Sequence, residues 1–297
     1  MLWKSEDQDE IMLKKFFCER ACNEPTVMAL GGFDGAHIGH KILIDRAKST
    51  GRTVGIMTIT GGKSGKSLFT ALERACIFRS LGVDFALELE FEEIKDMSPE
   101  KFIAFLGKEC NAETFVCGED FRFGKGALGT PKTIEDLGKN VFVEKILYDG
   151  DEKVGSSLIK RCLEKGEIER ANTLLGFPFF LQGEVVKDRG VGALIGFPTA
   201  NIPYPEEKFP LEKGVYESRV FVDGKEYKGI TNYGARPTFD NDVVVTETHL
   251  ISYMGNLYGK TLQVQFIKKL RENKKFENVE KLKEQLEKDV RRVTKDD

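Results

Sequence analysis

The stretch Gly31-Gly32-Phe33-Asp34-Gly35-Ala36-His37-Ile38-Gly39-His40 decides the fold of the first half of this chain. An apolar segment, Thr26 to Leu30, precedes it, and an apolar stripe with helical spacing continues beyond it. A strand, a glycine-rich turn and a helix in this order direct backbone N–H groups at an anion. Two of the three histidines, His37 and His40, stand at the first turn of the expected helix. Alone they would be ordinary surface histidines, but in this context they predict a nucleoside triphosphate site, because imidazoles donate to phosphate oxygens.

Length, charge and hydropathy narrow the class of protein. With 297 residues the chain is long enough for two domains, and its 40% hydrophobic content is enough for two cores. It has 45 basic and 48 acidic side chains, and this balance argues against a sequence-independent nucleic-acid binder. No stretch has the apolar length that spans a bilayer, and the charged N-terminus lacks the apolar core of a signal peptide. We therefore expect a cytoplasmic protein that binds neither nucleic acid nor membrane.

Strand and helix patterns alternate along the first half of the chain. A helix is expected over 70–81, ended by Gly82, and another begins at Ser98-Pro99-Glu100 with a cap residue, a proline and an acid. This alternation predicts an α/β domain with a doubly wound parallel sheet, whose ligands bind at the carboxyl ends of the strands. The expected strands are 27–30, 53–59, 85–91, 114–117 and 141–146.

The six cysteines show no metal-binding pattern. They contain no Cys-x-x-Cys pair, and all three histidines lie elsewhere in the sequence. Cys18 and Cys22 are four residues apart on an expected helix, which favours small buried side chains over ligands.

The second half has the period of β-structure. From about residue 179 the pattern alternates, and the run 217–230 predicts a hairpin around Asp223-Gly224. Strands over 243–251 and 261–267 complete an antiparallel β-barrel, and a helix from Asn278 closes it with an apolar stripe of Val279, Leu282, Leu286, Val290 and Val293. We expect one domain over residues 1–178 and a second over 179–297.

Four further motifs have simple structural explanations when each is taken alone. Gly118–Lys125 could be a polar turn, and Gly155–Lys160 could be a capped helix start. Gly192–Asn201 could be a Gly/Pro turn between strands, although this leaves most of the string unexplained. Glu247-Thr248-His249 could be a solvated strand face, with Glu247 and His249 on the same side.

Together these motifs resemble one known family. The string Gly-x-Phe-Asp-Gly-x-His-x-Gly-His resembles the nucleotidylyltransferase superfamily, and the other motifs resemble the bacterial bifunctional riboflavin kinases and FMN adenylyltransferases, also called FAD synthetases. The likeness runs from about Thr26 to Val290. It implies a nucleotidylyltransferase domain followed by a riboflavin kinase barrel.

For the first domain the resemblance implies a site that joins ATP to FMN. His37 and His40 would be catalytic, and Asp120, Phe121 and Arg122 would lie by the flavin and the nucleotide. The nucleotide-binding residues would be Gly32, Phe33, Asp34, Gly35, Gly39, Ser156, Ser157 and Lys160.

For the second domain the resemblance implies a kinase site. Thr199 and Asn201 would hold Mg²⁺, which prefers oxygen ligands, and Glu247 would be the base for the riboflavin hydroxyl. Arg271 would lie by the flavin. Gly192, Gly196 and Pro198 would bind the nucleotide.

The implied reactions are phosphorylation of riboflavin to FMN by MgATP and adenylylation of FMN to FAD with release of pyrophosphate. Riboflavin, FMN, FAD and ATP would thus be the binding partners, and Mg²⁺ the cofactor. Two departures affect the first site. Lys160 replaces the usual arginine, and the run Thr60–Ser67 replaces a proline-containing flavin loop without fitting the P-loop spacing.

Three alternatives stay open at this point. The chain could be a riboflavin kinase with a weak or inactive adenylyltransferase domain. It could be a non-catalytic flavin or nucleotide sensor, although a sensor has no need for the base Glu247. It could be a cytidylyltransferase, which would leave the second domain unexplained.

Overall fold

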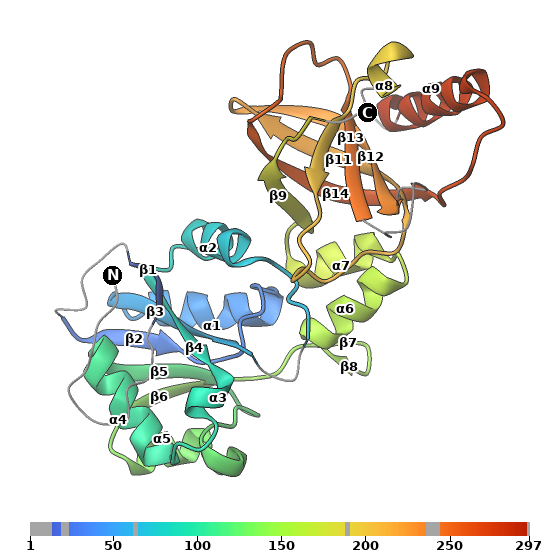
Figure 1. The fold of residues 1–297 in the computed structure, drawn as a ribbon. Helices are drawn as coiled ribbons and strands as arrows, with labels where there is room; N and C mark the ends of the chain where they lie inside the picture. Colours follow the sequence, from blue (N-terminus) through green and yellow to red (C-terminus); the bar gives the residue numbers. More distant parts are fainter. Residues whose placement is uncertain (1–13, 19–23, 62–64, 188–190, 236–243, 296–297) are drawn as a thin grey trace. The chain divides into compact units, whose positions relative to one another are not determined.

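The structure is a computed structural model that describes residues 14–18, 24–61, 65–187, 191–235 and 244–295. The chain forms two compact units, and the division falls between Leu158 and Ile159 (Figure 1). The domain boundary expected at 178/179 stays a prediction. Among the described helices, none has both the length and the hydropathy that a membrane span requires.

The first unit is built on a six-stranded sheet in the order β1-β4-β3-β2-β5-β6. All neighbouring pairs except β1 and β4 are parallel, so the predicted parallel α/β fold is confirmed. Helices lie on both sides of the sheet, with α1 and α2 on one side and α4 and α5 on the other (Figure 1). The parallel strands are β2 (Thr26–Ala29), β3 (Thr53–Thr60), β4 (Phe85–Glu90), β5 (Ala112–Gly118) and β6 (Asn140–Glu144), and the helices are α1 (Ile38–Lys48), α2 (Ala71–Ser80), α3 (Phe91–Ile94), α4 (Pro99–Cys110) and α5 (Pro131–Asp136).

The strand order places a ligand crevice beside β2. The chain leaves β2 toward β3 on one side, and after β4 it returns to form β5 on the other side. In open α/β sheets such a reversal leaves a crevice at the carboxyl ends of the two strands, and ligands bind there. The sequence motifs that follow β2 and β5, which begin at Gly31 and Gly118, therefore reach the same edge of the sheet.

The prediction of a helix at Cys18 is wrong. Residues Lys14–Cys18 form strand β1, which pairs antiparallel with β4 at the edge of the sheet. Local spacing suggested a helix, but pairing with the open edge of β4 satisfies the backbone of this segment instead. Cys22 lies outside the described residues.

Helix starts in this unit follow the expected cap chemistry. Thr70 and Glu73 form a reciprocal capping box at the start of α2. Ser98 accepts from the N–H of Lys101, and Pro99 occupies the first position of α4. Side chains of α4 and α5 pack with the sheet strands in one buried core, so the two helices hold the sheet face against which they lie.

The second unit is an antiparallel barrel. Its strands follow the order β10-β13-β12-β11-β14-β9, and the N–H of Val186 donates to the carbonyl of Asn201 at 2.9 Å, which brings the chain after β9 to β10 and nearly closes the sheet. The strands are β9 (Phe180–Glu184), β10 (Ala200–Pro203), β11 (Gly214–Val222), β12 (Lys225–Ala235), β13 (Val244–Leu250) and β14 (Thr261–Arg271). The hairpin turn Asp223-Gly224 has φ values of 51° and 80°, as the sequence predicts.

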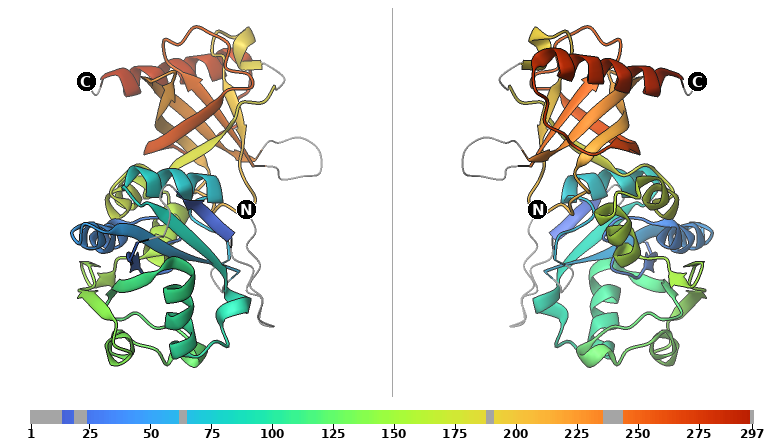
Figure 2. Two further views of the ribbon diagram at one scale, coloured as in Figure 1. Left: turned by 90° about the vertical axis from the view of Figure 1, so that its left-hand side faces the viewer. Right: turned by 90° about the vertical axis from the view of Figure 1, so that its right-hand side faces the viewer.

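Helix α9 (Val279–Lys295) closes the barrel as expected and lies across one end of it (Figure 2). Asn278 caps it, and Val290 and Val293 pack against a cluster of three strand residues. Val279 is half exposed, whereas the next two residues of the predicted stripe are partly buried and Val293 is fully buried, so burial of the stripe increases toward its C-terminal end. The cluster consists of Val215, Ile230 and Leu270.

The other short elements are η1 (Lys125–Ala127), β7 (Tyr148–Asp149), β8 (Glu152–Lys153), α6 (Ser156–Glu164), α7 (Ile168–Leu175) and α8 (Val191–Leu194). Helix α6 crosses the division between the units, so its first turn belongs to the first unit and its remainder to the second.

Candidate active sites

A cavity of about 670 Å³ lies at the carboxyl ends of β2 and β5. This volume is in the range that holds a whole small-molecule ligand. Most of the residues predicted for the first site line it together, although they come from three separate stretches of sequence. The predicted residues in the lining are Gly32, Phe33, Asp34, His37, Gly39, His40, Asp120, Phe121, Arg122, Ser156 and Ser157.

Two predicted residues are not among the described residues that line this cavity. Gly35 supports the turn instead, because its φ of +123° is open to glycine and an added Cβ would lie 2.8 Å from the Phe69 ring. Lys160 lies two residues beyond Leu158, in the part of α6 that belongs to the second unit, and its Nζ is 5.3 Å from the centroid of the Phe209 ring.

Two helix N-termini meet at the cavity. The first turn of α1 contributes His37 and Gly39, and the start of α6 contributes Gly155, Ser156 and Ser157. Each terminus presents backbone N–H groups without helical partners and the positive end of a helix dipole. Two such ends at one cavity favour a ligand with several negative charges, which a triphosphate has.

The histidine rings form a stack with Phe33. The centroids of His37 and His40 lie 3.7 Å apart with an interplanar angle of 18°, and those of Phe33 and His40 lie 4.2 Å apart. Phe33 is fully buried, so the stack fixes the ring planes from the core side.

Hydrogen bonds assign a proton to each ring. The backbone N–H of His40 donates to Nδ1 of His37 at 3.3 Å, so the neutral His37 ring carries its hydrogen on Nε2. Nδ1 of His40 lies 2.9 Å from the carbonyl oxygen of Gly35, which can only accept, so the neutral His40 ring carries its hydrogen on Nδ1. His37 therefore has a hydrogen-bond donor at Nε2, and His40 has an acceptor lone pair at Nε2.

Both imidazoles are neutral at pH 7. Burial and then the ammonium of Lys153 lower the pKa of His37 to about 4. Burial, the neighbouring His37 ring and Lys153 lower the pKa of His40 well below its usual value, and the bond to Gly35 opposes them. The fixed positive charge at this cavity therefore comes from its lysine and arginine side chains in the ligand-free protein.

A pH titration checks the neutral state of His37. In ligand-free protein, we expect the imidazole nitrogens of His37 to titrate near pH 4, with the signal assigned by its loss in H37N. Because the folded pKa lies below the ordinary 6.5, the unfolded chain binds more protons between these values. Stability should therefore rise with pH across this window and fall as the pH is lowered through it. Titration of His37 at pH 6 or above would contradict the assignment.

The loop at Thr60–Ser67 contacts the same cavity in its described part. Ser67 and the strand residue Ile59 line the cavity, and residues 62–64 lie outside the described part of the chain. The Oδ1 atom of Asp34 accepts from the N–H of Leu68 at 2.9 Å, which ties this loop to the glycine-rich turn. The end of the loop at Ser67 thus lies at the ligand space.

The segment after β5 supplies an aromatic surface. Phe121 stacks on Phe123 at 5.5 Å between centroids, with an interplanar angle of 19°. Phe121 is partly exposed at the cavity, whereas Phe123 is buried behind it. A half-exposed ring held in this way can take a flat ring system such as a flavin on its open face.

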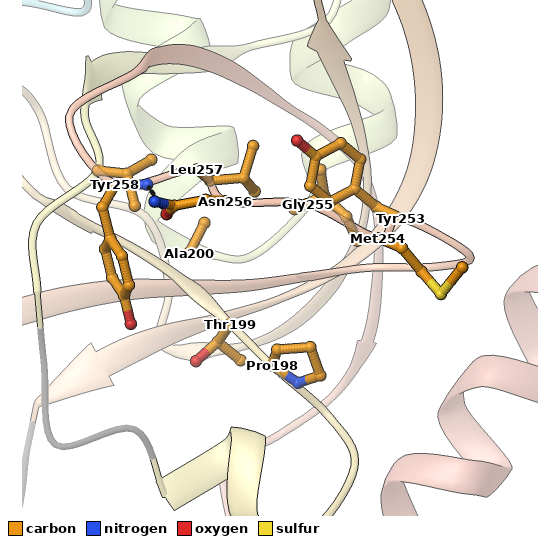
Figure 3. A pocket seen from close by; sticks show the side chains of 11 residues that line it. Pro198, Thr199, Ala200, Tyr253, Met254, Gly255, Asn256, Leu257 and Tyr258 are labelled. Carbon is orange, nitrogen blue, oxygen red and sulfur yellow. Dashed lines mark hydrogen bonds between the residues drawn. The ribbon is translucent and has the colours of Figure 1, made fainter.

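The second unit has a smaller cavity of about 270 Å³, which is small for a whole nucleotide. Figure 3 shows Pro198, Thr199 and Ala200 on one side and the loop from Tyr253 to Tyr258 on the other. Of the kinase residues that the sequence predicts, Pro198 and Thr199 are in the described lining.

Asn201 and Glu247 stand directly opposite each other in the β10–β13 pair, so their side chains share a face. Asn201 is 6% exposed, and its Nδ2 donates to the carbonyl of Thr199 at 3.5 Å, which turns the amide oxygen away from that carbonyl. The Thr199 hydroxyl and the Asn201 amide oxygen are uncharged oxygen donors, the kind of ligand that a hard cation such as Mg²⁺ accepts.

The remaining kinase residues are placed as follows. Gly192 belongs to α8, and its carbonyl accepts from the N–H of Phe197 at 2.8 Å, while Gly196 has a φ of +86° in the turn that follows. The guanidinium of Arg271 is bound by Asp289 of α9, with the shortest contact at 2.7 Å. Its predicted role beside the flavin stays a prediction.

The sequence reasoning missed one contact that supports the kinase motif. Nδ1 of His249 lies 2.9 Å from the carbonyl oxygen of Pro198, and the His249 ring meets Phe197 edge-on at 5.1 Å. His249 therefore ties the turn before Thr199 to the strand that carries Glu247. In the sequence, its position two residues after Glu247 indicates that the two side chains share a strand face. It does not indicate the contact with Pro198.

Lys145 and Lys153 also line the first cavity and were not predicted. Both lie between the recognised motifs, in stretches where a lysine has no distinctive local pattern. Only the folded arrangement brings them beside the histidines.

Comparison with known proteins finds a family match for each half of the chain. The sequence matches the FAD synthetase family over residues 19–158 and the riboflavin kinase family over residues 175–296. A bifunctional riboflavin kinase/FMN adenylyltransferase from Bacillus subtilis (strain 168) is 36% identical over 285 residues, with 89% of this chain and 90% of the relative covered. The protein of the same name from Escherichia coli (strain K12) is 30% identical, with 91% and 92% covered.

Among solved structures, the fold is similar to a crystal structure of a macrolide-efflux protein from Streptococcus pneumoniae. The TM-score is 0.84 at 26% identity, and the match covers 92% of this chain and 94% of that one. The two family matches and the nearly full-length relatives lead to the same result. This chain belongs to the family of bifunctional riboflavin kinases/FMN adenylyltransferases.

Proposed function

We propose that this chain makes FMN from riboflavin in its second unit and FAD from FMN in its first, with ATP as the second substrate of each reaction. The observation that carries the proposal for the first unit is the meeting of two helix N-termini and two neutral histidines at one large cavity. For the second unit it is the opposed pair Asn201 and Glu247 beside Thr199. The nearly full-length bifunctional relatives favour two active sites over a kinase with an inactive partner domain.

In adenylyl transfer, the FMN phosphate attacks the α-phosphorus of ATP while the bond to pyrophosphate breaks. Both reactants are anions, so the site must above all offset their repulsion. The Nε2–H of His37 donates to a phosphate oxygen without needing a charge. His40 stacks on the His37 ring and is held by the Gly35 carbonyl, so it orients this donor.

In phosphoryl transfer, Glu247 takes the proton of the riboflavin hydroxyl as that oxygen attacks the γ-phosphorus of ATP, while the bond from this phosphorus to the bridging oxygen breaks and ADP leaves. Thr199 and Asn201 would hold Mg²⁺ by their oxygen atoms. When bound, Mg²⁺ supplies neutralisation of the phosphate charge. The remaining contribution of the chain is to position the two substrates.

Product analysis tests both activities in the full-length chain. Riboflavin with MgATP should give FMN, and FMN with MgATP should give FAD, each detected by chromatography. Formation of FMN with no FAD at high enzyme concentration would support the kinase with an inactive adenylyltransferase domain. Tight binding of both ligands without either product would support a sensor, and turnover with CTP would support a cytidylyltransferase. A cytoplasmic location stays a prediction, consistent with the need for ATP.

His249 is a positioning residue for the kinase reaction. Replacement by Ala removes the bond to Pro198 and should raise the KM for MgATP in FMN formation about tenfold, the effect of one lost hydrogen bond. Asn places its amide nitrogen near the position of Nδ1, so H249N should recover most of the loss. Steady-state kinetics with riboflavin and MgATP separate this result from a fall in kcat alone. Equal effects of the Ala and Asn variants would rule out the positioning role.

A further inference from the structure

We propose that Lys153 is an ATP-binding residue of the first unit, and that it exchanges Asp120 for a phosphate oxygen when the nucleotide binds. This proposal rests on the proposed adenylyltransferase function and adds a residue that the family resemblance did not supply. Lys153 lies in strand β8, in a hairpin whose next residues start helix α6. Lys153 and the start of α6 therefore reach the cavity together.

The need for a cation follows from the neutral histidines. His37 and His40 carry no charge at pH 7 in the ligand-free protein. The described charged residues in the lining are the cations Arg122, Lys145 and Lys153 and the anions Asp34 and Asp120. ATP carries about four negative charges, of which a bound Mg²⁺ offsets about two, and the lining cations must meet the remainder, because the two helix dipoles supply only partial charges.

Among these cations, Lys153 is the one whose charge acts on the histidines. Its charge acts on both imidazole rings and lowers the pKa of each. Arg122 is turned to the backbone, because its Nη1 donates to the carbonyl of Phe121 at 2.9 Å. An ammonium whose charge acts on both histidines also acts on a phosphate bound beside them.

The present partner of Lys153 can be exchanged at small cost. Its Nζ forms an ion pair with the Asp120 carboxylate, and the two side chains are 51% and 47% exposed. Ion pairs exposed to this degree contribute little to stability. A polyphosphate carries more charge than one carboxylate, so Lys153 should leave Asp120 for the nucleotide. Asp120 would then face the flavin space without its partner cation. Binding of ATP would thereby change the charge that FMN meets, which links the binding of the two substrates.

The test compares the K153M and K153R variants of the full-length chain. We expect K153M to raise the KM for ATP in FAD formation about tenfold with little change in kcat. K153R keeps the charge and should have a KM close to that of the wild type. FMN formation by the same polypeptide should stay normal and reports that the variants are folded. The control K125M removes an exposed lysine from a similar ion pair, with Asp96 at 3.3 Å, outside the described cavity lining. It should behave as wild type.

Calorimetry with a nonhydrolysable ATP analogue and no flavin tests the exchange of Asp120 for phosphate at Lys153 separately from catalysis. D120N should tighten binding about threefold in the presence of Lys153 and should have no effect in the K153M background. In parallel, K153M should raise the pKa values of His37 and His40 in an NMR titration. Wild-type affinity in K153M, or an equal gain from D120N in both backgrounds, would overturn the proposal. Failure of the wild type to form FAD, with these binding effects intact, would instead overturn the proposed adenylyltransferase function.

Discussion

Replacement of His37 by Asn is expected to reduce FAD formation from FMN by about 10²- to 10³-fold, the usual effect of losing one preorganised donor to developing charge. Asn is chosen because His37 has two functions. Its Nδ1 caps helix α1 by accepting from the N–H of His40, and its Nε2–H faces the cavity. Asn is a good cap, so H37N should keep the helix and lose only the donor.

The expected result has a clear signature. Formation of FMN from riboflavin should stay at the wild-type rate, because that reaction belongs to the second unit. Thermal unfolding should also change little. A matched variant, K41M, alters an exposed residue of the same helix and should have no effect on either product. Near-normal FAD formation by H37N would show that this donor is not used in the reaction.

Replacement of Glu247 by Gln is expected to have the opposite pattern. FMN formation should fall by about 10²- to 10⁴-fold, because Gln cannot accept the proton of the riboflavin hydroxyl. FAD formation from supplied FMN should continue at the normal rate. The two rates are measured separately by chromatography, with riboflavin and FMN as alternative substrates.

Binding measurements distinguish a base from a merely structural residue. E247Q should bind riboflavin with nearly unchanged affinity, since the side chain keeps its size and its place opposite Asn201. E226Q changes an exposed glutamate of the neighbouring strand β12 and serves as the control. A loss of riboflavin binding equal to the loss of rate would argue against the role of Glu247 as a base.

The sequence predicted the fold well where local periodicity is strong. The alternating patterns of the first half correspond to parallel strands and helices, and the turn at Asp223-Gly224 marks a real hairpin. The edge strand Lys14–Cys18 was missed because its structure depends on pairing with β4, about 70 residues away in sequence. The apolar stripe on α9 was overestimated only at Val279, because an apolar pattern does not show where the packing surface ends.

The site was predicted through motifs, and its omissions have a physical cause. A motif records residues whose spacing is fixed by local backbone geometry, as at His37 and His40. The links between Lys153 and Asp120 and between His249 and Pro198 join segments 33 and 51 residues apart. Such contacts depend on how strands and hairpins are arranged in space. Likewise, the bond between Arg271 and Asp289 could not be read from either residue alone.

The course of helix α6 has a consequence for dissecting this enzyme. Its first turn supplies Ser156 and Ser157 to the nucleotide cavity, but from Ile159 onward its residues belong with the barrel. A stop codon placed at the division would leave only three residues of this helix. Three residues cannot complete one hydrogen-bonded turn, so the two serines would lose their scaffold. Gene fragments for the isolated adenylyltransferase should therefore extend through the whole helix, past Glu164.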